Sequence, residues 1–260
     1  MINWNVDPDI FQLGPFTIRW YGLLFAAGFI IGYQIMMYVF RKEKRNESHL
    51  NDLIWYMILG TVIGARLGHC FFYNPSYYLA NPLEILQVWK GGLASHGAAI
   101  GILLAIYFFV NKRKEYSYLW LIDRIAITVA LGGSFIRLGN LFNSEIIGKA
   151  TDVPWAFVFV SVDNVPRHPA QLYEAISYLL VFIILLVVYM KNNNKLKNGF
   201  MLGLFLILVF GFRFIVEFFK ENQTFFEQGM ALNMGQLLSI PFFLFGIYLL
   251  VRKEKKVLKV

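Results

Sequence analysis

Residues 132–148 carry the polar side chains with the clearest chemical potential in this chain. The stretch contains one arginine, two asparagines, one glutamate and four glycines, and it closes a long apolar run. Hydrocarbon offers no hydrogen bonds, so each of these polar groups needs a protein partner or water. Arg137 and Asn140 are one helical turn apart and therefore share a face. This pattern predicts a functional site at the end of a helix.

Three further positions have side chains that could act in chemistry. Arg213 and Glu217 are four residues apart on one helical face. They predict either a simple intrahelical ion pair or a glutamate that holds the guanidinium for a ligand. His96 follows small residues in 91–95 that leave space around its ring, which makes it a candidate base or a hydrogen-bonded structural histidine.

Metal and disulfide chemistry have little support in the sequence. The four histidines show no metal-ligand spacing, and the single cysteine, Cys70, gives neither an internal disulfide nor a thiolate cluster. We therefore expect no metal and no cofactor, and we expect Cys70 to pack between helices.

The elements that position these residues are predicted to be membrane helices. Hydrophobic residues make up 58% of the 260 and charged residues 15%, with a mean hydropathy of +0.55, which is too apolar for a soluble domain. We predict an all-α, polytopic membrane protein with a single membrane domain and about seven transmembrane helices. The predicted spans are residues 16–40, 53–73, 91–110, 118–141, 172–190, 199–219 and 236–251.

The segments between the spans are predicted from their breakers and polarity. Residues 1–15 should form an irregular lead, and residues 83–89 an amphipathic helix at the membrane interface. Residues 142–170 should form a small external segment, in which the apolar run 155–160 is either a strand or a patch that enters the headgroups.

The basic residues predict the orientation. The net charge is +8, but the segments after the first, third, fifth and seventh spans hold fifteen Lys and Arg residues, whereas the other side holds few. This distribution indicates topology and not a nucleic-acid partner. The N-terminus should be external and the C-terminus cytoplasmic.

With this orientation, the polar residues of the spans gather in the outer half of the membrane. Such asymmetry predicts a polar cavity that faces the outer leaflet. The alternative is an ion-pair network that locks helix ends. Guanidinium groups match phosphate, and an anionic phospholipid is a ligand present there. The residues concerned are Arg19, Tyr21, Arg66, His69, His96, Arg137, Asn140, Asn143, Glu145, Glu174, Arg213, Glu217 and Gln236.

The chain resembles a known family, the bacterial phosphatidylglycerol-prolipoprotein diacylglyceryl transferases. That family's signature is Gly-x-Arg-x-Gly-Asn-x-x-Asn-x-Glu-x-x-Gly, which this chain matches at Arg137 and at every fixed position from Gly139 to Gly148. Departures are Ala98, Lys220 and the pair Val209 and Phe210, where the family often has glycine, arginine and a tyrosine. The resemblance extends over nearly the whole chain, through residues 18–22, 91–97, 167–174, 213–218 and 235–236.

The resemblance implies an activity and its partners. The diacylglyceryl group of phosphatidylglycerol would pass to the lipobox cysteine thiol in the signal peptide of a prolipoprotein, with release of glycerol phosphate. The protein would act on membrane lipid in the bacterial cell membrane.

Roles for single residues follow as hypotheses. Arg137 and Arg213 would bind the phosphate, and His96 would be the base, with Tyr21 as a second ligand or proton carrier. The predicted substrate-binding residues are Arg137, Asn140, Asn143, Glu145, Gly148 and Glu217.

Two other functions are consistent with the residues themselves. An anion transporter would also use several spans and an arginine cluster, but it should show repeat symmetry, which the sequence lacks. A structural membrane scaffold would pair its polar residues within helices and have no lipid-sized opening.

Overall fold

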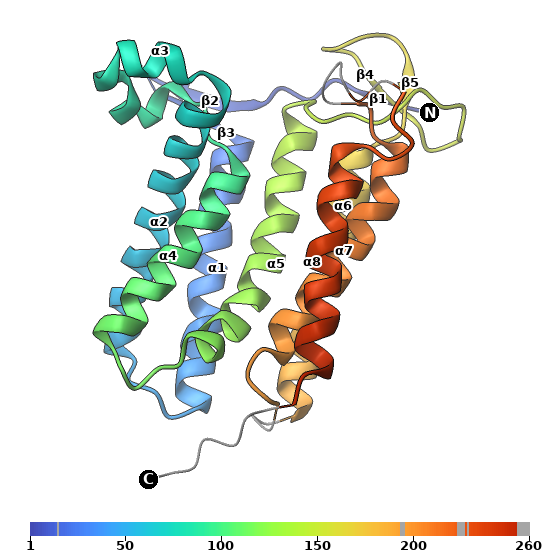
Figure 1. Ribbon diagram of the computed structural model, residues 1–260. Coiled ribbons are helices and arrows are strands. Elements are labelled where there is room, and N and C mark those ends of the chain that lie inside the picture. Colours follow the sequence, from blue (N-terminus) through green and yellow to red (C-terminus); the bar gives the residue numbers. More distant parts are fainter. Residues whose placement is uncertain (15, 193–195, 223–226, 228, 254–260) are drawn as a thin grey trace. The chain divides into compact units, whose positions relative to one another are not determined.

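The computed structural model describes residues 1–260 except 15, 193–195, 223–226, 228 and 254–260. Within this part, seven helices are long and apolar enough to cross a membrane, so the predicted fold class is confirmed (Figure 1). They are α1 (Trp20–Lys42), α2 (Ser48–Tyr73), α4 (Ser95–Lys112), α5 (Tyr118–Phe142), α6 (Ala170–Asn192), α7 (Phe200–Val216), which the 3-10 turn η3 (Glu217–Phe219) extends, and α8 (Met234–Val251).

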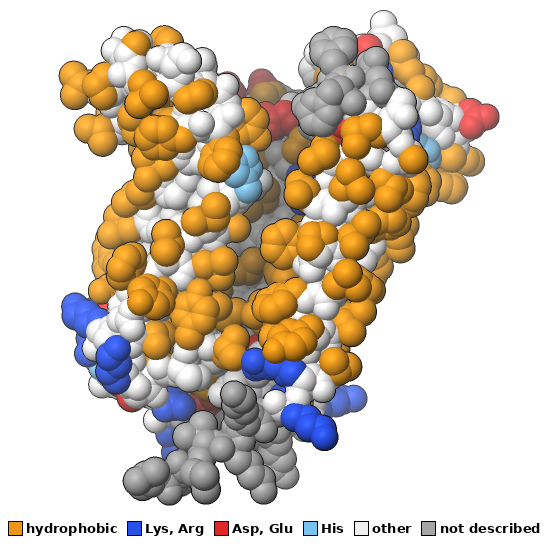
Figure 2. Space-filling model, in the orientation of Figure 1, with side chains coloured by type: hydrophobic (Ala, Val, Ile, Leu, Met, Phe, Trp, Pro, Cys, Tyr) orange, Lys and Arg blue, Asp and Glu red, His pale blue; other side chains and the backbone are white. Residues whose placement is uncertain are grey.

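The chain divides into two compact units. The α5–α8 unit contains Met1–Ile35 and Asp123–Val260, and the α2–α4 unit contains Met36–Ile122. Helices α1 and α5 therefore each begin in one unit and end in the other. In each unit, apolar side chains cover the helix flanks, and Lys and Arg side chains gather at the helix ends opposite α3 or the strands (Figure 2).

Glycines let α2 and α4 pack with their backbones in contact. A Cβ atom at Gly64 would lie 2.8 Å from the Gly101 Cα atom, and one at Gly68 would lie 2.7 Å from the Gly97 Cα atom. Small residues at four-residue spacing permit this close approach in membranes. Cys70 of α2 is fully buried, as expected for a residue that packs between helices.

Arg66 organises the segment that joins α2 to α4. This segment contains α3 (Pro75–Ala80) and the 3-10 turns η1 (Pro82–Leu86) and η2 (Val88–Lys90), in place of the predicted amphipathic helix. The Arg66 guanidinium is buried and donates to the carbonyl oxygens of Glu84 at 2.6 Å, Ile85 at 3.0 Å and Gly91 at 2.6 Å. It is therefore occupied by backbone acceptors, although the sequence grouped it with the predicted cavity.

In the α5–α8 unit, α7 packs against α6 and α8 (Figure 1). The buried Asp123 carboxylate of α5 determines where α7 begins, because it accepts from the backbone N–H groups of Gly199 at 2.7 Å and Leu202 at 2.9 Å. Asp123 also forms an ion pair with its neighbour Arg124, which is longer, at 3.8 Å.

The N-terminal residues form strands, so the predicted irregular lead is wrong. β1 (Ile2–Trp4) pairs in parallel with β4 (Phe157–Phe159), and β4 pairs with β5 (Pro166–Arg167). β2 (Asp9–Leu13) and β3 (Phe16–Arg19) form a separate hairpin. Residues 16–19 are thus a strand and not the start of the first span, because aromatic and β-branched residues suit a strand as well as an apolar helix.

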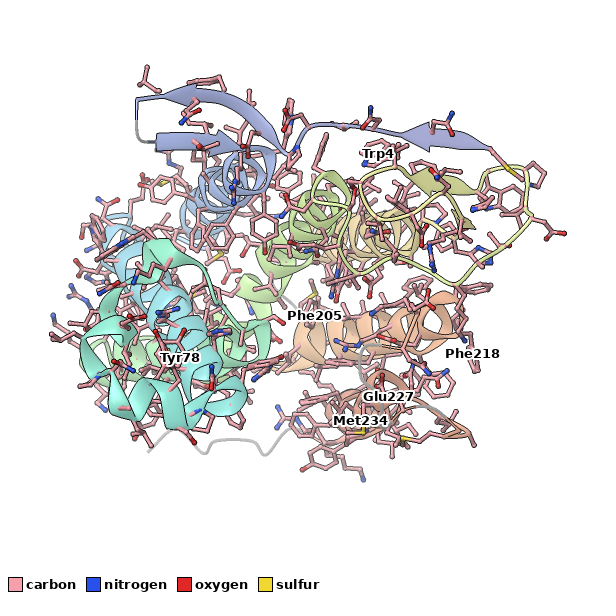
Figure 3. The ribbon with its side chains drawn as sticks, turned by 90° about the horizontal axis from the view of Figure 1, so that it is seen from above. Trp4, Tyr78, Phe205, Phe218, Glu227 and Met234 are labelled. Carbon is pink, nitrogen blue, oxygen red and sulfur yellow. The ribbon has the colours of Figure 1, made fainter. Side chains whose placement is uncertain are left out.

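The sheet holds the end of α5 in place. The Trp4 indole N–H donates to the Leu141 carbonyl oxygen at 3.0 Å, and Figure 3 shows Trp4 below the ribbon of β1. The Phe142 ring packs against Trp4, with ring centroids 5.8 Å apart, and stacks on Trp20 at 4.9 Å. The polar stretch at the end of α5 is therefore anchored by aromatic contacts from both sides of Phe142.

Candidate functional site

The first predicted arginine is held by a glutamate from the next helix. The Arg137 Nε atom at the end of α5 lies 3.1 Å from the Glu174 Oε2 atom in the first turns of α6. The Glu174 side chain is 3% exposed, whereas Arg137 is 16% exposed. The Glu174 carboxylate is thus buried, whereas the Arg137 guanidinium remains partly exposed.

The second arginine has the same kind of support. The Arg213 Nε atom at the end of α7 lies 3.6 Å from the Glu217 Oε1 atom, with side chains 32% and 5% exposed. Glu217 also accepts from the Asn233 Nδ2 atom at 3.2 Å. The predicted intrahelical pair exists, but its glutamate is shared with another segment. The ion pair of Arg213 with Glu217 is therefore weaker than it would be if Glu217 had no other partner.

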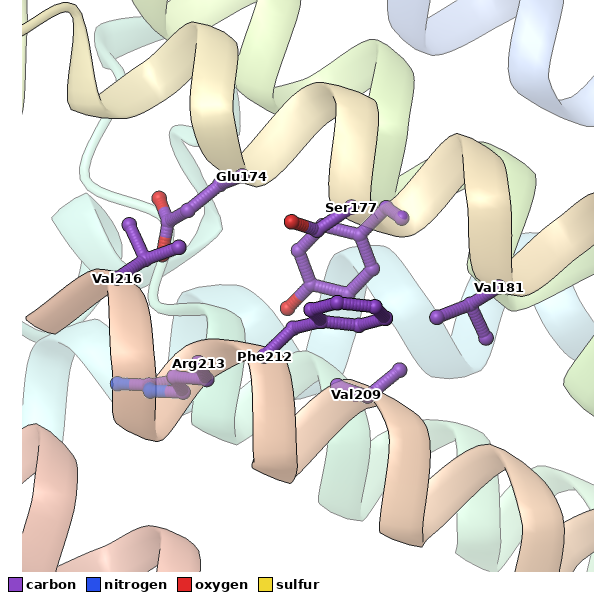
Figure 4. Close-up of a pocket in the computed structure, with 8 residues that line it drawn as sticks. Glu174, Ser177, Val181, Val209, Phe212, Arg213 and Val216 are labelled. Carbon is purple, nitrogen blue, oxygen red and sulfur yellow. The ribbon is translucent and has the colours of Figure 1, made fainter.

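Lys220 connects the two arginine-glutamate pairs. Its Nζ atom lies 2.8 Å from Glu217 Oε1 and 3.6 Å from Glu174 Oε1, and the residue is 4% exposed. In Figure 4, Glu174 on α6 faces the turns of α7 that carry Arg213 and Val216, around a small pocket. Five charged groups from α6, α7 and the ends of α5 and η3 therefore form one continuous row.

The two asparagines and Glu145 extend this row by hydrogen bonds. Asn140 accepts from Arg137 Nη1 at 3.3 Å and donates to Glu145 Oε2 at 3.1 Å. Asn143 donates to Glu145 Oε1 at 3.2 Å, and Gln171 donates to the Glu145 carbonyl oxygen at 2.6 Å. The Glu145 carboxylate is thus used to orient amides.

Four polar atoms of this cluster have no hydrogen-bond partner among the described residues. They are Arg213 Nε, a donor, and three acceptors, Asn143 Oδ1, Gln171 Oε1 and Glu174 Oε2. Buried polar atoms are rarely left unsatisfied, so such atoms indicate where a ligand or water would bind. Arg213 Nε and Asn143 Oδ1 together would suit a ligand that has both acceptor oxygens and hydroxyl groups.

Most glycines of the 132–148 stretch make room for protein rather than for a ligand. A Cβ atom at Gly139 would lie 2.6 Å from the Tyr21 ring, and one at Gly133 would lie 3.0 Å from the Tyr178 ring. Gly148 packs against the backbones of His168 and Phe219. Gly132 has no such neighbour within 4 Å. The aromatic ring of Tyr21 therefore lies directly on the helix that carries Arg137.

His96 lies in the α2–α4 unit as the second residue of α4, and its side chain is exposed. Its ring packs edge-on against Phe72, with centroids 5.2 Å apart, and beside Tyr73 at 5.9 Å. The structure therefore gives His96 an aromatic setting at a helix start. The other predicted site residues, Tyr21, Arg137, Asn140, Asn143, Glu145, Gly148, Arg213 and Glu217, belong to the α5–α8 unit.

His168 contacts Tyr173 in the first turns of α6. The His168 Nδ1 atom lies 3.1 Å from the Tyr173 hydroxyl, which also accepts from the Trp155 indole N–H at 2.8 Å. Burial lowers the pKa of His168 below its ordinary value, so the imidazole is neutral near pH 7. This cluster tethers Trp155, in the segment between α5 and α6, to the start of α6.

Three residues with central contacts were given no role from the sequence. Glu174 appears only in the set of polar residues, and Lys220 only as a departure from the family pattern. Asn233 is the N-cap of α8, in a capping box with Gln236. The Asn-x-x-Gln spacing could have revealed this cap, but its contact with Glu217 depends on tertiary structure. Among the described residues, no group of three His, Cys, Asp or Glu could hold a metal.

Comparison with known proteins gives consistent matches. A family model described as prolipoprotein diacylglyceryl transferase matches residues 8–252. Three relatives bear the name phosphatidylglycerol-prolipoprotein diacylglyceryl transferase. The one from Tolumonas auensis is 52% identical, over 98% of this chain and 99% of its own. The one from Chloroherpeton thalassium is 53% identical, over 98% and 95%, and that from Bacteroides fragilis is 49% identical, over 98% and 96%.

Proposed function

The chain belongs to the prolipoprotein diacylglyceryl transferase family, and we propose that it transfers the diacylglyceryl group of phosphatidylglycerol to a cysteine thiol of a prolipoprotein. The product is a thioether, and glycerol phosphate leaves. Seven apolar helices make the protein a multi-pass membrane transferase. Family membership also decides against the anion transporter and the structural scaffold.

One observation carries the assignment of the site. Two guanidinium groups, Arg137 and Arg213, keep partial exposure while the carboxylates that hold them are buried. Arginine is the side chain best suited to phosphate, since it offers a fixed fork of donors and a permanent charge. We assign both arginines to the phosphate of phosphatidylglycerol.

The reaction needs a base and fixed cations. The thiol must lose its proton before its sulfur attacks the glyceryl carbon. As the carbon–sulfur bond forms, the carbon–oxygen bond to the phosphate breaks, and its electron pair stays on the phosphate oxygen. Arg137 and Arg213 would stabilise this developing charge, and His96 would accept the thiol proton.

The remaining residues would bind and orient the headgroup. The free Oδ1 atom of Asn143 would accept from a glycerol hydroxyl, and Asn140 would align Arg137. Glu145 and Glu217 orient these groups, and Tyr21 would be a second ligand or proton carrier. Gly148 would contribute to substrate binding indirectly, because the absence of a side chain lets the backbones of His168 and Phe219 pack against it.

The acceptor and the orientation are further parts of the proposal. The acceptor would be the lipobox cysteine in the signal peptide of the prolipoprotein, in the bacterial cell membrane. The N-terminus would be external and the C-terminus cytoplasmic, as the distribution of basic residues supports.

The phosphate assignment can be tested with purified protein, phosphatidylglycerol and a lipobox peptide. We expect Arg137→Gln and Arg213→Gln each to lower kcat/KM by about 10²- to 10³-fold, because each loses a cation at the leaving group. The assay measures glycerol phosphate and thioether peptide, and a peptide with Ser for Cys should give neither.

Arg41→Gln is the matched control, because Arg41 is 64% exposed and pairs with Glu47 outside the α5–α8 unit. It should retain activity. Wild-type transfer by either site variant would remove that arginine from the phosphate site.

A further inference from the structure

Lys220 lies where the sequence alone would not place a lysine. It follows the 3-10 turn η3 at the external end of α7, yet its side chain is almost fully buried. Lysines are rarely buried unless they are paired. The pairing here is with two carboxylates, Glu217 and Glu174, which themselves hold Arg213 and Arg137.

The charges of this row explain what the lysine does. Two carboxylates close together in a buried site repel each other. If Lys220 were absent, the charge of each carboxylate would be balanced only by that of its arginine. With Lys220 between them, the five groups carry three positive and two negative charges, which leaves one positive charge for a ligand. Glu145 is left out of this balance because it is exposed and bonds to Asn140 and Asn143. Without Lys220, the arginines and glutamates would cancel. The guanidinium donors would then be drawn toward Glu174 and Glu217 and away from an incoming phosphate.

The backbone around Lys220 gives a reason for a glycine at 148. Lys220 forms a β-bridge with Gly148. Next to it, the Lys149 N–H donates to the Phe219 carbonyl oxygen at 2.8 Å, and the Glu221 N–H donates to Ile147 at 3.3 Å. A side chain at 148 would collide with His168 and with the Phe219 carbonyl oxygen. Any residue other than glycine would therefore disturb the backbone packing next to Lys220.

We propose that Lys220 is a positioning residue for diacylglyceryl transfer, which holds Glu174 and Glu217 so that Arg137 and Arg213 remain available to the substrate phosphate. The proposal rests on the assignment of the two arginines to phosphate. Lys220 acts through the carboxylates and does not touch the substrate. Gly148 contributes to the reaction by letting the Lys220 backbone approach.

The test compares four variants in the transfer assay, each with its thermal unfolding. Lys220→Met should raise KM for phosphatidylglycerol at least about tenfold, because the row of charged groups loses its net positive charge. Lys220→Arg keeps the charge and should remain within about threefold of wild type. Lys149→Met is the matched control, since Lys149 is an exposed neighbour that donates to a backbone carbonyl oxygen, and it should behave as wild type.

The fourth variant separates charge balance from packing. Lys220→Met with Glu174→Gln removes one charge of each sign, so it restores the net positive charge and should lower KM again by several-fold. If the double variant is folded but as defective as Lys220→Met, or if Lys220→Met has a wild-type KM, the proposal is wrong. If Lys220→Met does not fold, KM of the double variant is compared with that of Lys220→Arg. Similar values support the proposal, and a much higher KM in the folded double variant contradicts it.

Arg213→Gln in the same series separates this proposal from the phosphate assignment. If Arg213→Gln loses activity while Lys220→Met is unaffected, the role of Lys220 alone is refuted. If Arg213→Gln keeps wild-type activity, the phosphate assignment itself fails, whatever Lys220→Met does.

Discussion

The two arginines at the ends of α5 and α7 differ in how they are held. Arg137 is close to Glu174 and also donates to Asn140, whereas Arg213 stands 3.6 Å from Glu217 and has a free Nε donor. A donor without a partner gains more from a new acceptor than one that must exchange partners. Arg213 is therefore the guanidinium better prepared to take a phosphate oxygen.

Residue types predicted several of the polar residues that the structure brings together at the candidate site. An arginine such as Arg137 inside an apolar helix is costly, so its position itself points to a function. The sequence missed Lys220, because its burial results from contacts with Glu174, which lies 46 residues earlier in the chain. Local spacing contains no information about such a contact.

The base assignment is tested by replacing His96 with glutamine. We expect His96→Gln to lower kcat by about 10²- to 10⁴-fold, because the thiol proton would lose its acceptor. KM for phosphatidylglycerol should change little, since His96 is not assigned to the phosphate. The measurement is the rate of thioether formation at saturating lipid.

His49→Gln is the control, because His49 contacts Glu115 and Tyr116 and has no proposed role in transfer. Unchanged kcat in His96→Gln would mean that another group takes the proton, and Tyr21 would be the next residue to examine.

At the scale of elements, helix termini build the candidate site. The stretch after α5, the start of α6, the end of α7 and the start of α8 each contribute polar side chains. Hydropathy predicted these helices with ends that differ from the observed ones by a few residues. It failed for residues 16–19, because an apolar window does not distinguish a strand beside a helix from the helix itself. The long-range pairing of β1 with β4 left no local signal either.

The cap of α8 links helix formation to the site, which gives a prediction. Asn233 accepts from the Gln236 N–H at 2.9 Å through its oxygen and donates to Glu217 through its nitrogen. Asn233→Ser keeps a capping oxygen but loses the donor. We expect it to unfold at nearly the wild-type temperature while KM for phosphatidylglycerol rises a few-fold.

Asn233→Ala loses both contacts, so it should also lose about 1 kcal/mol of stability. Thermal unfolding in detergent and lipid titrations measure the two effects. A wild-type KM in both variants would show that Glu217 does not depend on Asn233.

For the whole molecule, composition was sufficient to predict a polytopic α-helical membrane protein. Few soluble folds tolerate 58% hydrophobic residues, and the structure contains seven candidate spans in its described part. The division into two compact units was not predicted, because their boundaries at residues 35 and 122 fall inside the continuous helices α1 and α5. No break in composition marks either position.

The predicted orientation can be measured with single cysteines in a Cys70→Ala background. We expect Asp7→Cys to react with a membrane-impermeant maleimide in right-side-out vesicles, and Lys253→Cys to react after permeabilisation. Both positions are exposed in the structure. The background without added cysteine should remain unlabelled, and the reverse pattern would contradict the external N-terminus.

The parallel pairing of β1 with β4 sets an order for biogenesis. Residues 2–4 are synthesised first, but their partner residues 157–159 emerge after the first four long helices, α1, α2, α4 and α5. Until then β1 has an unpaired edge. Contacts between residues so far apart in the sequence form late, because closing the long loop between them costs conformational entropy before the contacts add any stability. The sheet beside the end of α5 can therefore be completed only after residues 157–159 have been synthesised, so a half-made chain would carry Arg137 without that sheet.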